Sequence, residues 1–174
     1  QLEDSVVKSI SSKKDIYSGF KYFEFEKFKS LVVYFASNEV KLFKTKLMKL
    51  LWYCDNEFFK INTTSITGLE YARLPRGPVI ENRELLLGLL VKEGVISLIE
   101  DIDTNGEYIV VEKDIDTSLN DDELKTAKEI FDKFRTFNSK KISDYSHDEL
   151  AWKETKMGKQ ISYEYAKYID INRN

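Results

Sequence analysis

The chain contains one cysteine, one histidine and two prolines among its 174 residues. A lone cysteine, Cys54, cannot form an internal disulfide, which fits a reducing compartment. One histidine, His147, and one cysteine cannot supply the usual ligands of a zinc site. No Gly-x-Ser-x-Gly sequence is present, and a histidine-activated nucleophile would have to use His147. These scarcities favour a protein that is not an enzyme and holds neither a metal nor a cofactor.

One metal chemistry stays open, because a magnesium site needs only one or two carboxylates. The nearest nuclease-like spacing combines Asp116 with Glu123 and Lys125. This set falls at the start of a predicted helix, whereas a nuclease site of this kind would need a strand. An enzyme therefore remains an alternative class, which substitution of His147 would test.

Long apolar runs and an excess of positive charge are also missing. The longest apolar runs are about six residues, against the roughly 20 that a membrane-spanning helix needs. The net charge is −3, so no overall basic field attracts nucleic acid or anionic lipid. The first residues carry no basic segment followed by an apolar one, so no signal peptide is visible. We expect a cytoplasmic protein without membrane attachment.

The apolar residues that are present recur mostly at helical spacing. This periodicity predicts helices over 24–37 and 43–61, the second apolar on so many sides that it should cross the core. A capping box at Asn120–Glu123 opens a helix to Phe134. Asn105-Gly106 lies between the strand-like runs 95–99 and 108–111 and predicts a hairpin. The fold class is therefore mainly helical α+β, a helical core with a small antiparallel insert in a winged-helix-like order.

Residues 64–86 form a junction that holds both prolines. We predict a turn at Gly68, a short strand to Leu74, and a helix over 79–93 with Pro78 in its first turn and Gly94 just past its end. A second capping box is predicted at Ser146–Glu149, opening a short helix toward Trp152. Residues 161–169 are expected to form a helix or turn. The domain is assigned to residues 22–172, and residues 1–21 to a linker or N-terminal arm.

The charges of the predicted hairpin argue against DNA binding by a winged helix. Residues 95–114 contain six acids and one lysine, and like charges repel phosphate. Lys41, Lys44, Lys46 and Lys49 are expected to form a solvated helix face. The acids could instead meet a basic, nucleic-acid-targeting protein.

Several spaced motifs resemble the Panacea domain, also called the SocA-like antitoxin domain. They are Lys46-Leu-Met-Lys-Leu-Leu-Trp-Tyr-Cys-Asp55, Ser65-Ile-Thr-Gly68, Tyr71 with Gly77-Pro78-Val79, and Ile142-Ser-x-Tyr-Ser-His147 with Trp152. The resemblance covers roughly residues 22–170. Arg76 stands where an aromatic residue is common in the family, and Ile80 where proline is frequent.

The resemblance implies an antitoxin that neutralises a cognate protein toxin in a bacterial or phage toxin–antitoxin pair. It also implies a role as an adaptor to an ATP-dependent protease, and a helix-turn-helix domain before residue 1 that would bind operator DNA. The only methionines, Met48 and Met157, are internal, so we expect the chain to be part of a longer protein. The alternative is the sensing or dimerisation half of a helix-turn-helix regulator, and a homodimer is a further expectation.

We place the partner-binding residues in a recognition groove around the Gly-Pro junction and the C-terminal aromatic residues. The aromatic and basic side chains would anchor the partner. The candidates are Tyr71, Arg76, Gly77, Pro78, His147 and Trp152. The competing interpretation is structural: Ser146 and Glu149 cap a helix, His147 bonds locally and Trp152 fills the core.

Overall fold

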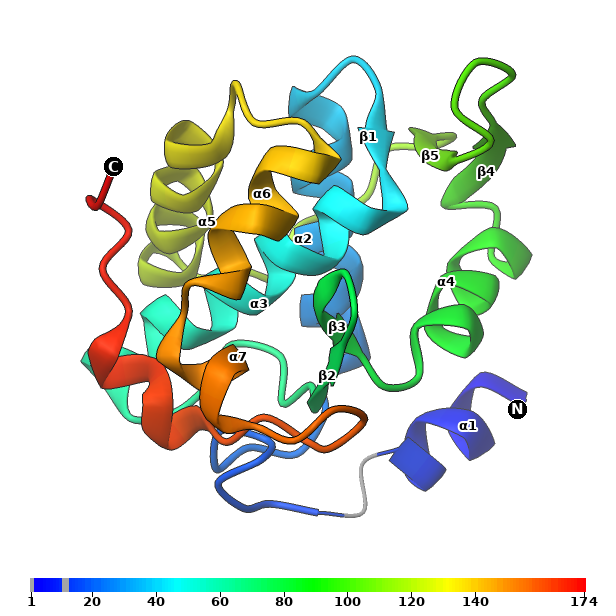
Figure 1. The fold of residues 1–174 in the computed structure, drawn as a ribbon. Coiled ribbons are helices and arrows are strands. Elements are labelled where there is room, and N and C mark those ends of the chain that lie inside the picture. The colour runs from blue at the N-terminus through cyan, green and yellow to red at the C-terminus, as the bar shows by residue number, and fades with distance from the viewer. Residues whose placement is uncertain (1, 11–12) are drawn as a thin grey trace.

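The structure, a computed structural model, describes residues 2–10 and 13–174 and is shown in Figure 1. Positions 1, 11 and 12 of the predicted N-terminal arm lie outside these residues. The described helices are α1 (Leu2–Ile10), α2 (Phe25–Asn38), α3 (Lys44–Asn62), α4 (Arg83–Lys92), α5 (Asp121–Phe134), α6 (Ser139–His147), α7 (Leu150–Glu154) and the 3-10 helix η1 (Tyr163–Tyr168). The strands are β1 (Leu42–Phe43), β2 (Tyr71–Leu74), β3 (Gly77–Ile80), β4 (Ile96–Glu100) and β5 (Glu107–Val111).

Helix α3 runs through the middle of the molecule, as its broad apolar surface predicts (Figure 1). Helices α2, α5 and α6, the hairpin β2–β3 and η1 all pack against it. Its central turns are buried on every side, including Leu47, Leu50, Leu51, Trp52 and Phe58. Because these central turns are surrounded, a polar side chain on them must find its partner inside the protein.

The sheets are small and antiparallel, which confirms the mainly helical α+β class. Strands β4 and β5 form the predicted hairpin, and β1 extends it in the order β1-β5-β4. Strand β1 was not predicted, because two residues are too short to show an alternating pattern. Strands β2 and β3 form a separate hairpin whose register pairs Arg73 with Pro78. The winged-helix-like order remains a prediction.

The prediction of Pro78 in the first turn of a helix is wrong. Residues Gly77–Ile80 form β3, and α4 begins only at Arg83. Val79 and Ile80 pair with Ala72 and Tyr71 and are buried, so tertiary packing outweighs the helical preference of the Gly-Pro-Val sequence. Proline is tolerated in a two-stranded hairpin since its nitrogen has no proton to leave unpaired.

The second predicted capping box is also wrong. Ser146 lies inside α6, where its hydroxyl donates to the carbonyl of Ser143, and Asn138 caps that helix by accepting from Lys141 N. Glu149 is the N-cap of α7, but its side chain makes no capping bond. The first capping box, at Asn120 on α5, is confirmed. In the predicted N-terminal arm, Leu2–Ile10 forms helix α1 beside α4 (Figure 1).

Candidate functional site

Asp55 on α3 organises the loop that leads into the β2–β3 hairpin. Its Oδ1 accepts from the backbone nitrogens of Ile66 (2.9 Å) and Thr67 (3.0 Å). Its Oδ2 accepts from the hydroxyls of Thr67 (2.6 Å) and Tyr71 (2.7 Å). Burial raises the pKa of Asp55, and the hydrogen bonds from Thr67 and Tyr71 oppose that rise. The Ser-Ile-Thr-Gly loop is thus fixed to the central helix by one carboxylate.

Tyr71, a predicted partner-binding residue, lies in β2 with its side chain in the core. Its side chain is 1% exposed and its hydroxyl is committed to Asp55. Burial raises the pKa of Tyr71 well above its ordinary value. Tyr71 is therefore buried on the inner face of the hairpin, whereas Arg76 is exposed at its turn.

Gly77 and Pro78 are buried where the hairpin touches α3 and α6. A Cβ on Gly77 would lie 2.6 Å from Lys49 Cε and 2.5 Å from Ser146 Oγ. Gly77 also has a φ of +107°, which L side chains rarely adopt. Only glycine lets the hairpin approach both helices this closely.

We expect Gly77→Ala to lower the free energy of unfolding by about 2 kcal/mol, because strain and the close contacts add. Urea unfolding monitored by tryptophan fluorescence measures this loss. Gly158→Ala is the matched control: it shares a positive φ, but nothing lies within 4 Å of its Cβ. Equal losses in the two variants would mean that backbone strain alone matters and that the close approach does not.

Lys49 lies directly under the hairpin. Its side chain is fully buried, and its Nζ makes no hydrogen bond within residues 2–10 and 13–174. Burial, reinforced by the positive charges of Arg76 and Arg83, lowers the pKa of Lys49 to about 7. The expectation that the lysines around residue 45 form a solvated face is wrong for Lys49 and for Lys46, which is also buried.

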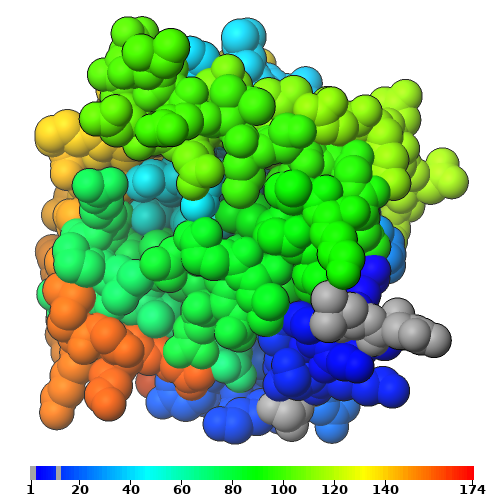
Figure 2. All heavy atoms as spheres, turned by 90° about the vertical axis from the view of Figure 1, so that its right-hand side faces the viewer, coloured from blue at the N-terminus to red at the C-terminus, as the bar shows by residue number. Residues whose placement is uncertain are grey.

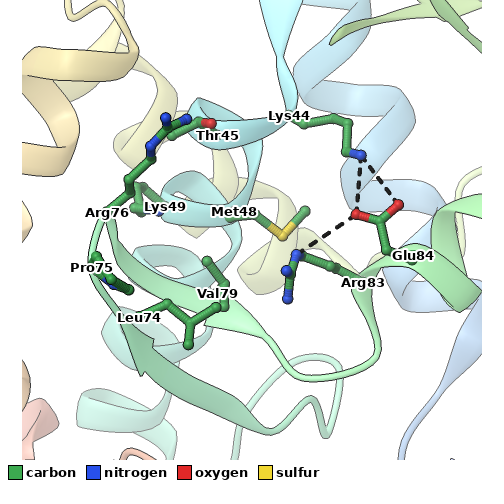
Figure 3. A pocket seen from close by; sticks show the side chains of 10 residues that line it. All are labelled: Lys44, Thr45, Met48, Lys49, Leu74, Pro75, Arg76, Val79, Arg83 and Glu84. Atoms are coloured by element: carbon green, nitrogen blue, oxygen red, sulfur yellow. Dashed lines mark hydrogen bonds and ion pairs between the residues drawn. The ribbon is translucent and has the colours of Figure 1, made fainter. Parts of the chain in front are cut away.

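A pocket of about 350 Å³ opens beside Lys49. Figure 2 shows a hollow on this face with atoms near the start of α3, coloured cyan, at its floor. In Figure 3 Met48 points into the pocket, and Arg76 and Arg83 lie on either side of it. Lys44 donates to Glu84, which also pairs with Arg83 at 3.7 Å. The lining residues are Lys44, Thr45, Met48, Lys49, Leu74, Pro75, Arg76, Val79, Arg83 and Glu84.

A second pocket, of about 280 Å³, lies on the other side of Arg76 and reaches His147. Trp152 stacks on His147 with ring centroids 4.2 Å apart, and the Arg73 guanidinium lies 3.8 Å from the Trp152 ring centre. Trp152 Nε1 donates to the carbonyl of Leu74. His147 Nε2 is buried and has no hydrogen-bond partner in the described part of the chain, and Trp152 is only half-buried, so the tryptophan is not part of the core.

The structure thus brings together Arg76, His147 and Trp152 at the tip of the β2–β3 hairpin. Gly77 and Pro78 support this tip from below, and Tyr71 lies apart from it. Sequence reasoning missed Lys49 as a site residue, because a lysine on an amphipathic helix ordinarily faces water. The signal that could have found it is its place between apolar neighbours, Met48 and Leu50, on the helix that the sequence predicts to cross the core.

The acidic residues of the hairpin β4–β5 are not all exposed to solvent. Asp101 is buried, pairs with Lys41 at 2.9 Å and accepts from the Thr104 hydroxyl, so it stabilises the turn. Glu100 and Asp103 are exposed, and no ion pair involves either of them in the described part of the chain. Between them Ile102 is 93% exposed.

Within residues 2–10 and 13–174, no three His, Cys, Asp or Glu side chains gather closely enough to bind a metal ion. No described helix combines the length and apolar character needed to span a membrane. Cys54 is fully buried, and burial raises its pKa well above the ordinary value, so its thiol is not positioned as a nucleophile.

Comparison with known proteins gives one result. The family described as "Antitoxin SocA-like, Panacea domain" matches residues 47–153, from α3 through α7. No curated protein and no solved structure gives a significant match. The matched segment contains Asp55, the β2–β3 hairpin and most of the residues that line the two pockets, and it spans more than half of the chain. The chain therefore belongs to the SocA-like antitoxin family with a Panacea domain.

Proposed function

We propose that this chain is an antitoxin that neutralises a cognate protein toxin by binding it directly, without catalysing a reaction. The observation that carries the proposal is the family match over residues 47–153. The chemistry of the described side chains supports it, since the only thiol is buried and the only histidine is stacked on Trp152.

The surface best suited to the toxin is the tip of the β4–β5 hairpin, which we call the acidic knob. It consists of Glu100, Ile102, Asp103 and the neighbouring Val40, which is fully exposed. The Lys41–Asp101 ion pair joins the residue that follows Val40 to the residue that precedes Ile102. Exposed apolar side chains supply binding energy at an interface, and flanking carboxylates set orientation and association rate. The knob therefore fits a toxin with a basic surface.

The test is co-expression with the product of the adjacent gene, followed by measurement of affinity and of growth rescue. We expect Glu100→Lys combined with Asp103→Lys to weaken binding at least tenfold, about 1.4 kcal/mol, mainly through slower association at low salt. Asp101 is left intact because its loss would disturb the turn. Binding kinetics at two salt concentrations measure the effect.

The matched control is Asp116→Lys combined with Glu129→Lys, which changes the net charge equally at exposed positions outside the hairpin. Unchanged affinity in the knob variant, or equal losses in the two variants, would remove the acidic knob from the interface. Failure of the unsubstituted chain to bind or to rescue growth against the neighbouring gene product would contradict the antitoxin assignment itself.

The groove formed by Arg76, His147 and Trp152 is the second candidate contact. Arg76→Glu in the same assay tests it, because Arg76 is exposed and its substitution leaves the stacked ring pair in place. A protease-adaptor mechanism is separated from simple sequestration by the toxin level in cells: handover to a protease lowers it, and sequestration preserves it.

A further inference from the structure

The pocket beside Lys49 combines two properties that point to an anionic ligand. Its walls are apolar, from Met48, Leu74 and Val79, and its charged groups are mostly positive. Among its cations, Lys44 and Arg83 pair with Glu84, and Lys44 also pairs with Glu107. Among the described residues, those contacts leave Lys49 and Arg76 without an ion-pair partner.

Of these two cations, Lys49 gives the stronger evidence for an anionic ligand. A buried lysine ordinarily has a carboxylate or several acceptors around it, since desolvation of an ammonium group is costly. Here the Nζ has no acceptor within the described residues, although the side chain lines a pocket. The nearby positive charges of Arg76 and Arg83 further disfavour the charged form of Lys49. A ligand anion would supply what the protein does not.

Arg76 lies at the entrance and is free to contribute. It is exposed, and its guanidinium makes no hydrogen bond or ion pair with residues 2–10 or 13–174. It sits at the turn of the β2–β3 hairpin, which Gly77 holds against Lys49 and Ser146. Arginine binds planar or tetrahedral oxyanions through two parallel donors. In Figure 3 Arg76 and Arg83 flank the space in front of Met48.

We propose that this pocket is a binding site for a compact oxyanion, a phosphate or carboxylate group on a small apolar body, held by Lys49, Arg76 and Arg83. A volume of about 350 Å³ accommodates a group of that size. Binding would place a proton on Lys49, because a neighbouring negative charge favours the ammonium form. The inference goes beyond toxin binding, and the isolated chain is sufficient to test it.

The experiment titrates the full chain with inorganic phosphate and, separately, with acetate, at constant ionic strength set by chloride. The readouts are calorimetry and the NMR shift of the Lys49 13Cε and 15Nζ nuclei. We expect saturable binding by at least one probe, with the Lys49 signals moving to the protonated position. Saturation by phosphate alone identifies a phosphoryl ligand, and saturation by acetate identifies a carboxylate such as an acidic side chain of a partner.

Three variants make the result specific. Lys49→Met and Arg76→Gln should each weaken binding at least tenfold, whereas Lys128→Met, an exposed lysine on α5, should not. The site is overturned if neither probe saturates beyond the chloride control, or if Lys49→Met binds as the unsubstituted chain does. Neither outcome depends on a toxin, so this inference and the antitoxin assignment can fail independently.

Discussion

Lys49→Met is expected to stabilise the protein at pH 7, by about 2 to 4 kcal/mol in the free energy of unfolding. The folded-state pKa of Lys49 is lowered to about 7 because burial, reinforced by the charges of Arg76 and Arg83, disfavours the ammonium form. In the unfolded chain the lysine keeps its ordinary pKa near 10.5. Folding at pH 7 therefore releases a large part of the proton that Lys49 carries in the unfolded chain. By linkage, this lowers the free energy of unfolding by an amount on the order of 4 kcal/mol. Methionine has a similar length and carries no charge, so the cost disappears.

The pH dependence provides the sharper measurement. Between pH 7 and about 10 the unfolded state binds more protons at Lys49, so the stability of the unsubstituted chain rises with pH in that window. The advantage of Lys49→Met should therefore shrink by about 2 kcal/mol between pH 7 and 9. Urea unfolding at pH 7, 8 and 9 tests this, with Lys128→Met as a control within about 0.5 kcal/mol of the unsubstituted chain. A constant difference across this range would show that Lys49 does not titrate there.

The helices with strong local signals were predictable from the sequence. The spacing of apolar residues placed α2, α3 and α5 within about two residues of their ends, and Asn120 with Glu123 marked the start of α5. Such signals are local, because periodicity and caps involve residues within one or two turns. Helix α6 is short and has only two apolar residues, Ile142 and Tyr145, and its cap, Asn138, was overlooked in favour of Ser146.

Strand β2 of the hairpin was predicted from the sequence, but β3 was predicted as a helix. The candidate site depends on β3. Pro78 has a backbone that suits either a helix start or a strand, and the choice is made by contacts with α3 and α6 that are distant in sequence. The same contacts bury Lys49 and expose Arg76. Arg76, His147 and Trp152 were proposed as groove residues from the sequence, but their separation from the buried candidates Tyr71, Gly77 and Pro78 required the fold.

Asp55→Ala is expected to destabilise the protein by about 4 kcal/mol or more. The substitution leaves two backbone N–H groups, of Ile66 and Thr67, and the hydroxyls of Thr67 and Tyr71 without their acceptor in the core. Each buried group without a partner costs about 1 to 3 kcal/mol, although the hydroxyls can reorient. Because the loop 65–68 leads into β2, the hairpin that carries Arg76 should loosen as well. Urea unfolding measures the stability, and hydrogen exchange at Ile66 and Thr67 measures the loop.

Two milder variants resolve which interaction matters. Tyr71→Phe removes one hydroxyl donor and should cost about 1 to 2 kcal/mol. Asp55→Asn keeps the shape and lets the Thr67 and Tyr71 hydroxyls turn to accept from the new amide, so it should fall between Tyr71→Phe and Asp55→Ala. Since burial raises the pKa of Asp55, removal of its charge offsets part of the loss in Asp55→Asn. A loss below about 1 kcal/mol in Asp55→Ala would contradict the role of this carboxylate as the anchor of the hairpin.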